Sequence, residues 1–253
     1  EMTSSLVGSE MCIRDSYKIM VCISENSREK ELQYIDLLYS HRVLGIVVCS
    51  HIGETMEHLD SNCPLISFER EIAENIPAVL CDNYQGGILA ANRLFDAGCR
   101  NIAIFNPPTK ENIPAYSREK AFMKCCEDKK ISGRVVYTDR LAPLSEEFGN
   151  NILELLKKNS DLDGIFATSD VMAANIIRAC KKMGKRVPED ISIVGFDDTW
   201  ISTLTYPSIT TIHQPVQEMC EYAIEAIVKK VKGEKVPSQV VFPVELIDRE
   251  STK

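Results

Sequence analysis

Two adjacent carboxylates, Asp197 and Asp198, end the apolar stretch EDISIVGFDDT (residues 189–199). Residues 191–195 are mostly apolar and carry no charge, which is typical of a strand covered on both faces. A carboxylate at the end of such a strand can accept charge-assisted hydrogen bonds from two vicinal hydroxyl groups. We therefore interpret Asp197 as a ligand-binding residue, and a solvated turn is the alternative interpretation.

Polar side chains also follow two other apolar segments. SFER places Glu69 and Arg70 after one strand, and ATSD places Ser169 and Asp170 after another. Ligands of doubly wound sheets bind outside the carboxyl ends of the strands, so these groups and Asp197 can line one crevice. The alternative for the ATSD pair is helix capping, which is the role we expect for Asp170 because VMAANII follows it.

The motifs that would support an enzyme are absent from the sequence. It has neither a G-x-x-x-x-G-K-[ST] nor a G-x-G-x-x-G phosphate-binding loop, and no G-x-S-x-G nucleophile elbow. Cys49, Ser50 and His51 are consecutive, but neighbouring residues of a strand point to opposite faces and do not converge. We expect no catalytic residues, no metal site and no cofactor.

The composition is that of a globular protein with one or two domains. Of the 253 residues, 44% are hydrophobic and 26% are charged, and no apolar run approaches the roughly 18 residues of a membrane span. The formal net charge of −8, without a basic tract, argues against nucleic-acid binding by this chain itself. The ten cysteines form no C-x-x-C pair, so we expect free thiols in a reducing cytoplasm.

Apolar strand-like segments alternate with amphipathic helical segments along the chain. The expected strands are 17–23, 44–49, 64–68, 78–81, 101–105, 134–137, 163–168, 191–196 and 239–247, and the expected helices are 29–40, 83–97, 117–128, 145–158, 170–183 and 215–232. Gly98 and Gly184 stand where two helices should end in a left-handed residue. Strands separated by such helices form parallel sheets, so we predict an α/β fold with two lobes, each a doubly wound parallel sheet.

Three segments resemble the effector-binding core of the lactose-repressor and galactose-repressor (LacI/GalR) family of bacterial transcription regulators. They are VLCDNYQGGILAANRLFDAGCRNIAIF (79–105), DGIFATSDVMAANIIRACKKMGKRVP (163–188) and VPEDISIVGFDDTWISTLTYPSITTIHQP (187–215). They occur in the family's order, the ending FPVELIDREST fits as well, and the resemblance covers the chain after residue 16. It implies the two-lobed periplasmic-binding-protein-like fold (type I), with three crossovers and a small ligand between the lobes.

The resemblance also implies how the lobes divide the chain. The first lobe is expected to hold residues 17–106 and 214–236, and the second lobe residues 107–213 and 237–250. Residues 1–16 fit neither lobe, and the string LVGSEMCIRDS resembles a translated sequencing-library adapter, so we expect a non-native leader there. Tyr17 lines up with the family's second strand, so we expect the helix-turn-helix head and the first strand to be missing.

The positions that match the family imply a set of effector-binding residues. Asp197 matches the family's ligand-binding aspartate, Arg118 its arginine at a helix start, and Glu69 an acidic position. Gln214 falls on a crossover position that faces the cleft, and Ser169 replaces the usual asparagine. A hydroxyl cannot make the bidentate contact of an amide, so Ser169 alters the polar pattern of the ligand, for which a sugar is the default.

The aromatic side chain that often stacks on the ligand in this family is a second departure. Its place in the loop after RVVY is taken by Ala142. Trp200 or Phe148 would therefore have to supply the apolar face of the site.

The implied function is the effector-sensing domain of a cytoplasmic transcription regulator. Such a regulator forms a homodimer when intact, contacts operator DNA only through the missing head, binds no membrane and catalyses no reaction. The alternative is the sugar-binding protein of a transporter, which would need a signal peptide. The segment VPEDISIVGFDD and the scattered free cysteines favour the regulator.

Two expectations concern the first lobe. The helix at 29–40 presents Leu32, Ile35 and Leu38 or Tyr39 on one side, and in the family first-lobe elements near here join the dimer. Without the family's first strand, the strands at 17–23 and 44–49 should have exposed edges that favour aggregation. We therefore expect a well-formed second lobe, 107–212, and a first lobe that is loosened around residues 17–60.

Overall fold

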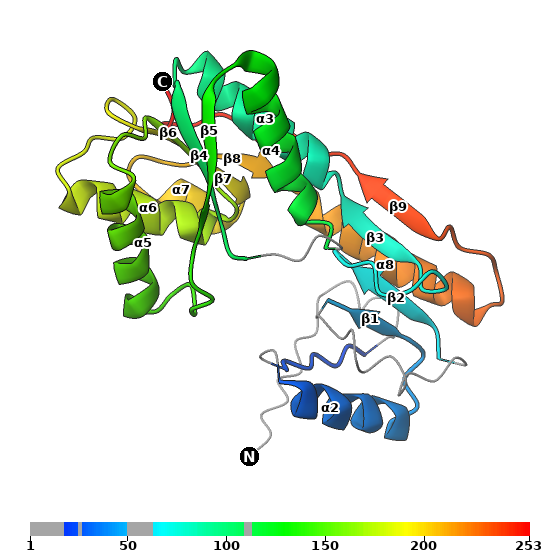
Figure 1. Ribbon diagram of the computed structural model, residues 1–253. Helices are drawn as coiled ribbons and strands as arrows, with labels where there is room; N and C mark the ends of the chain where they lie inside the picture. The colour runs from blue at the N-terminus through cyan, green and yellow to red at the C-terminus, as the bar shows by residue number, and fades with distance from the viewer. Residues whose placement is uncertain (1–17, 25–26, 50–62, 109–112) are drawn as a thin grey trace.

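The computed structural model describes residues 18–24, 27–49, 63–108 and 113–253. In these residues the chain forms two sheets of mainly parallel strands, and each sheet has its own helices packed against it (Figure 1). The predicted α/β class with two lobes is therefore confirmed. The expected leader at 1–16 lies outside the described residues.

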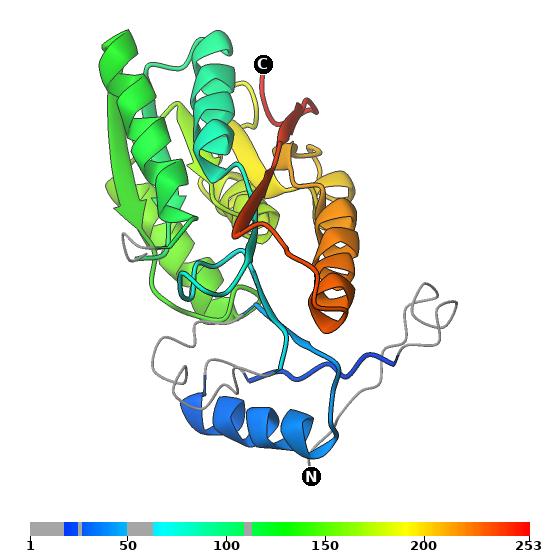
Figure 2. The same ribbon diagram turned by 90° about the vertical axis from the view of Figure 1, so that its right-hand side faces the viewer.

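The first sheet has four parallel strands in the order β1-β2-β3-β9. These are β1 (Ile46–Val48), β2 (Leu65–Phe68), β3 (Ala78–Cys81) and β9 (Gln239–Phe242). The helix α8 (Val216–Val231) packs on β1, β2 and β3. The helix α2 (Arg28–Ser40) lies at the far end of this lobe and adds Leu38 and Tyr39 to a small apolar cluster around Ile46 and Leu65 (Figure 2).

The second sheet has six strands in the order β10-β8-β7-β6-β4-β5, and of these only β10 is antiparallel to its neighbour. They are β4 (Asn101–Asn106), β5 (Ser132–Tyr137), β6 (Gly164–Ala167), β7 (Ser192–Asp197), β8 (Thr210–His213) and β10 (Glu245–Ile247). The helices are α3 (Asn83–Asp96), α4 (Tyr116–Lys129), α5 (Glu146–Lys158), α6 (Asp170–Lys182) and α7 (Trp200–Leu204).

Helices cover both faces of the second sheet, as the apolar strands predict. The helices α3 and α4 pack together on one face, and α5 and α6 pack together on the other (Figure 1). The core under α3 and α4 holds the rings of Phe122, Phe166 and Phe196, whose successive centroids are 5.8 and 6.4 Å apart. The same apolar cluster reaches Ile66 and Val79 of the first sheet, so the two lobes share a packed junction.

The chain passes between the sheets three times: after β3, after β8, and between β9 and β10. The expected boundary at residue 106 is not where the chain changes sheets, because α3 packs on α4 and β4 pairs with β5 and β6. The expected assignment of 237–250 to the second lobe also differs, since β9 pairs with β3 and only β10 joins the second sheet. These two boundaries came from the family resemblance, and hydrophobic periodicity could not correct them, because it identifies a strand but not the strand's partner.

The local signals at helix ends have the expected geometry. Gly98 and Gly184 take positive φ angles of +86° and +71° after α3 and α6. Residues 18–24 belong to no strand, contrary to the expectation for 17–23, and β1 is the edge strand of the first sheet. Ile35 of α2 is buried against its own lobe, and Leu38 and Tyr39 are partly buried there; the place of this helix in a dimer interface stays a prediction.

The close contact between α3 and α4 depends on Gly87. A Cβ atom added there would lie 2.3 Å from the carbonyl oxygen of Arg118 and 2.9 Å from the Cβ of Ala121. We expect Gly87→Ala to push the two helices apart and to destabilise the protein by about 1–3 kcal/mol, as overpacked cores do. Chemical denaturation followed by circular dichroism would measure this free energy of unfolding.

Gly149→Ala is the matched control. Gly149 is also inside a helix, but an added Cβ would meet only Oδ1 of Asn175, at 3.4 Å. Because alanine is favoured over glycine in a helix by about 1 kcal/mol, this variant should be as stable as the wild type or more so. An equal loss of stability in Gly87→Ala and Gly149→Ala would show that α3 and α4 are not closely packed at Gly87.

Candidate functional site

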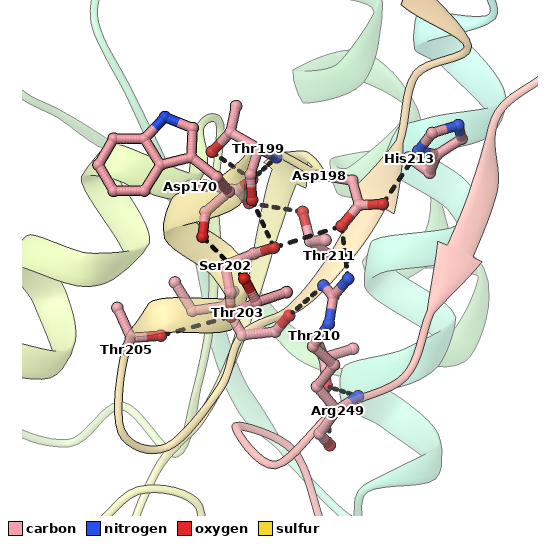
Figure 3. Close-up of polar contacts among 12 residues, drawn as sticks. Asp170, Asp198, Thr199, Ser202, Thr203, Thr205, Thr210, Thr211, His213 and Arg249 are labelled. Atoms are coloured by element: carbon pink, nitrogen blue, oxygen red, sulfur yellow. Dashed lines mark hydrogen bonds and ion pairs between the residues drawn. The ribbon is translucent and has the colours of Figure 1, made fainter.

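The turn after β7 places its two carboxylates in different surroundings. Asp198 accepts hydrogen bonds from Arg249 Nη2 at 2.6 Å and from Ser202 Oγ at 3.3 Å, and His213 Nδ1 lies 3.0 Å from its Oδ2 (Figure 3). Burial raises the pKa of Asp198, but Arg249 and His213 outweigh it and hold the pKa below its usual value. Asp198 therefore fastens the end of β7 to β8 and to the C-terminal segment.

The adjacent ATSD turn is also structural in part. Ser169 Oγ accepts from the backbone N–H of Met172 at 3.2 Å, so Ser169 is the N-cap of α6, and the capping role expected for Asp170 is wrong. Asp170 is instead fully buried and accepts from the Thr199 N–H and the Thr211 hydroxyl, each at 2.6 Å (Figure 3). These bonds join α6 to the turn that carries Asp197.

Asp197 is the carboxylate that remains available. Among the residues that the structure describes, Gln214 is its one side-chain donor, with Nε2 at 2.6 Å from Oδ1. Burial raises the pKa of Asp197 to about 7; Arg118 and Gln214 oppose this shift, and the carboxylates of Asp170 and Glu69 add to it. Its φ of +106° is also unusual for a residue with a side chain. A desolvated, strained carboxylate is characteristic of a functional position.

The guanidinium of Arg118 lies at the start of α4 and is almost completely buried. Its Nε donates to Oδ1 of Asn83, and its Nη1 donates to the carbonyl of Thr168 at 3.2 Å. Its centre lies 3.5 Å from the centroid of the Phe196 ring, in cation–π contact. Arg118 therefore joins α4 to the N-terminus of α3 and to the ends of β6 and β7.

Glu69 carries the contact to the first sheet. It follows β2 with a positive φ of +53°, and its carboxylate accepts from the backbone N–H of Cys81 and from Asn83 Nδ2 at 3.2 Å. Its Oε2 lies 4.0 Å from Arg118 Nη2. The neighbouring Arg70 donates Nη1 to the Glu69 carbonyl, while its buried Nε has no hydrogen-bond partner among the described residues. Such an orphan donor is suited to a ligand oxygen.

The structure brings four of the five predicted site residues together. Asp197 and Gln214 are hydrogen-bonded, Arg118 and Glu69 approach each other, and the charges of both act on Asp197. In the described part of the chain Ser169 makes no hydrogen bond to these four residues, and its hydroxyl caps α6. The arrangement offers acceptors and donors from both lobes, which suits a neutral ligand with several hydroxyl groups.

Sequence reasoning did not assign three residues of this cluster. Asn83 stands in the turn after β3, where a strand followed by Asp-Asn could have been recognised as another polar strand end. The sequence predicts that Arg70 lines the crevice together with Glu69, but the family resemblance does not include it among the effector-binding residues. Phe196 has the pattern of an ordinary core residue, so nothing in the sequence distinguishes it.

Other chemistries receive no support from the described residues. Within the described ranges, no group of three or more His, Cys, Asp or Glu side chains could hold a metal ion. Ser50 and His51 lie outside those ranges. Phe148 lies on the inner side of α5, buried in the core, and cannot supply an apolar face to the site, whereas Trp200 is exposed. None of the helices in the described part is both long and apolar enough for a membrane span.

The chain is similar to known regulators over most of its length. The profile of the periplasmic binding protein-like domain family matches residues 91–252. The ribose operon repressor of Halalkalibacterium halodurans is 31% identical, over 94% of this chain and 71% of the repressor. The sucrose operon repressor of Lactococcus lactis is 29% identical, over 91% and 70%.

Solved structures show the same fold. A periplasmic binding protein/LacI transcriptional regulator from Alkaliphilus metalliredigens, complexed with D-xylulofuranose, has a TM-score of 0.85 and 32% identity. The similarity covers 96% of this chain and 91% of that one.

The raised pKa of Asp197 makes stability depend on pH. A folded-state pKa of about 7, against 3.8 for the free group, means that the folded state binds the proton more tightly. The stabilisation by this bound proton is complete below the pKa of Asp197 in the unfolded state. It amounts to roughly 1.4 kcal/mol for each unit by which the folded-state pKa exceeds the unfolded-state pKa, and it is lost as the pH rises through about 7. Asp197→Asn should therefore be more stable than the wild type above pH 7, with a flatter profile between pH 4 and 7.

Urea denaturation at a series of pH values would measure this difference. Glu127→Gln is a suitable control, because Glu127 is an exposed carboxylate on the same lobe. If Asp197→Asn and the wild type keep the same pH profile, Asp197 does not titrate in the range that its burial implies.

Proposed function

The chain belongs to the LacI/GalR family of transcription regulators, and from this premise we propose that it is the part of a sugar-operon regulator that binds the sugar effector. The observation that carries the proposal is the desolvated carboxylate of Asp197, held by Gln214 and faced by the charges of Arg118 and Glu69. A sugar brings vicinal hydroxyls that can donate to Asp197 while its oxygens accept from an arginine.

The relatives favour a sensor over a transport protein or an enzyme. Both repressors named above are regulators of sugar operons, and the similar solved structure holds a pentulose. The proposed domain therefore changes shape on binding and catalyses nothing. It acts in the cytoplasm, where the operator DNA is. Because the chain is acidic, with a net charge of −8, the DNA contact is made by a separate DNA-binding domain.

Calorimetric titration with D-ribose, D-xylulose and sucrose tests the proposal. We expect one of these sugars to bind, and Asp197→Ala to weaken that binding by on the order of tenfold to a hundredfold, as the loss of a charged hydrogen bond does. Asp161→Ala, which removes an exposed carboxylate, should bind like the wild type. Unchanged affinity in Asp197→Ala would remove Asp197 from the site.

We also propose that the intact regulator is a homodimer, and an exposed apolar patch on the second lobe supports this. Trp200, Leu204 and Tyr206, on and just after α7, are 72%, 74% and 92% exposed. Trp200 and Leu204 are four residues apart and so share one side of the helix. Adjacent exposed apolar side chains of this size are typical of an interface.

Leu204→Asp should shift the protein from dimer to monomer, since it places a charge inside the proposed apolar interface. Light scattering at micromolar concentration would measure the mass. Leu144→Asp is the matched control, because Leu144 is 87% exposed on the same lobe and lies outside the patch. A wild-type chain that is monomeric, or a Leu204→Asp variant that stays dimeric, would contradict the proposal.

A further inference from the structure

The helix that carries Arg118 begins without a side-chain cap. Ala115 is the N-cap residue of α4, and it makes no side-chain hydrogen bond to the helix. The first N–H groups of α4 donate instead to the carbonyls of residues 113–115, so this turn is held by its own backbone. These bonds do not tie the turn to the sheet, so another group must fix the position of Arg118 relative to the strands.

Glu119 is the residue that anchors this turn to the sheet. Its side chain is buried, with the residue 6% exposed, and both carboxylate oxygens accept hydrogen bonds. Asn106 Nδ2 donates to Oε2 at 3.1 Å, and the Tyr137 hydroxyl donates to Oε1 at 3.0 Å. Asn106 ends β4 and Tyr137 ends β5, so this carboxylate ties α4 to two strands.

The anchor is continuous with Arg118 itself. Asn106 Oδ1 accepts from the Thr168 hydroxyl at 3.2 Å, and the Thr168 carbonyl accepts from Arg118 Nη1 at 3.2 Å. The bonds therefore run from Glu119 through Asn106 and Thr168 back to the neighbouring side chain of Arg118. Within the described residues, none of the ion pairs includes Glu119, although burial of an unpaired carboxylate is costly.

We propose that Glu119 is a positioning residue for effector binding, which holds the first turn of α4 so that the guanidinium of Arg118 stays opposite Asp197. The inference rests on the proposed function, because Arg118 matters here as an effector-binding group. Glu119 itself contacts no effector. It acts by fixing the backbone of α4 on the ends of β4 and β5.

The titration of Asp197 separates this role from a merely structural one. The groups that act on the Asp197 carboxyl are Arg118 and Gln214, which lower its pKa, and Asp170 and Glu69, which raise it. Removing the negative charge of Glu119 without moving Arg118 would lower the titration midpoint of Asp197. Moving Arg118 away would raise the midpoint, because attraction between charges falls with their separation.

The experiment is a carbon-13 NMR titration of the Asp197 carboxyl in the full chain without any sugar. We expect Glu119→Ala to raise the midpoint by about half a pH unit or more, as a weakened charge contact would. Glu119→Gln should leave the midpoint at or slightly below the wild-type value. The tyrosine hydroxyl can accept from the amide while the amide oxygen still accepts from Asn106, so Arg118 stays in place and only a negative charge is lost. Glu127→Ala, an exposed carboxylate at the other end of α4, is the matched control.

Tyr137→Phe provides a second route in case Glu119→Ala does not fold. It removes one hydroxyl from a half-exposed ring, and it should raise the Asp197 midpoint by a smaller amount. A midpoint that is unchanged or lowered in both Glu119→Ala and Tyr137→Phe would overturn the proposal. Since no sugar is present, this outcome is independent of whether D-ribose, D-xylulose or sucrose binds.

Discussion

Burial of the Arg118 guanidinium is the constraint on which the rest of the site depends. A buried cation is stable only where its N–H donors are satisfied and opposite charges lie near. Here the donors reach Asn83 and the Thr168 carbonyl, and the flat face lies on Phe196. These partners lie at the start of α3, just after β6 and near the end of β7, so these three ends must meet at one place. Gly86 permits this approach, because a Cβ there would lie 2.7 Å from the Phe196 ring.

The GFDD turn shows how surroundings give two identical side chains different roles. Asp198 is paired with Arg249 and His213, so its charge is neutralised within the fold and it serves to join strands. Asp197 takes only an amide donor and sits in a desolvated position that disfavours its charge. The pairing of Asp198 stabilises the second lobe, whereas Asp197 can still accept hydrogen bonds from the hydroxyl groups of a ligand.

The sequence predicted the elements of this fold better than their assembly. Periodicity identified the helices α3 to α6 and α8 to within a few residues, and Gly98 and Gly184 marked their ends. It could not predict that QVVFPVELI divides into β9 and β10 in different sheets, since pairing partners are set by tertiary contacts. Motifs predicted four residues that the structure brings together, and their role in effector binding stays a proposal. Asn83 and Phe196 act through burial and orientation, which a single sequence does not encode.

The position of the cluster explains how occupancy could alter the relation between the lobes. Glu69 belongs to the first sheet, Arg118 and Asp197 to the second, and Gln214 to the crossover before α8. A ligand shifts a conformational equilibrium only by its difference in affinity between the two states. A sugar that bonds to both Asp197 and Arg70 can make both contacts only when the lobes are close, so it binds the closed state more tightly than the open one. A sugar that bonds to a single lobe binds both states equally. The Arg118 network crosses the same junction through Asn83 and Glu69, so a sugar bound there would act on groups of both lobes.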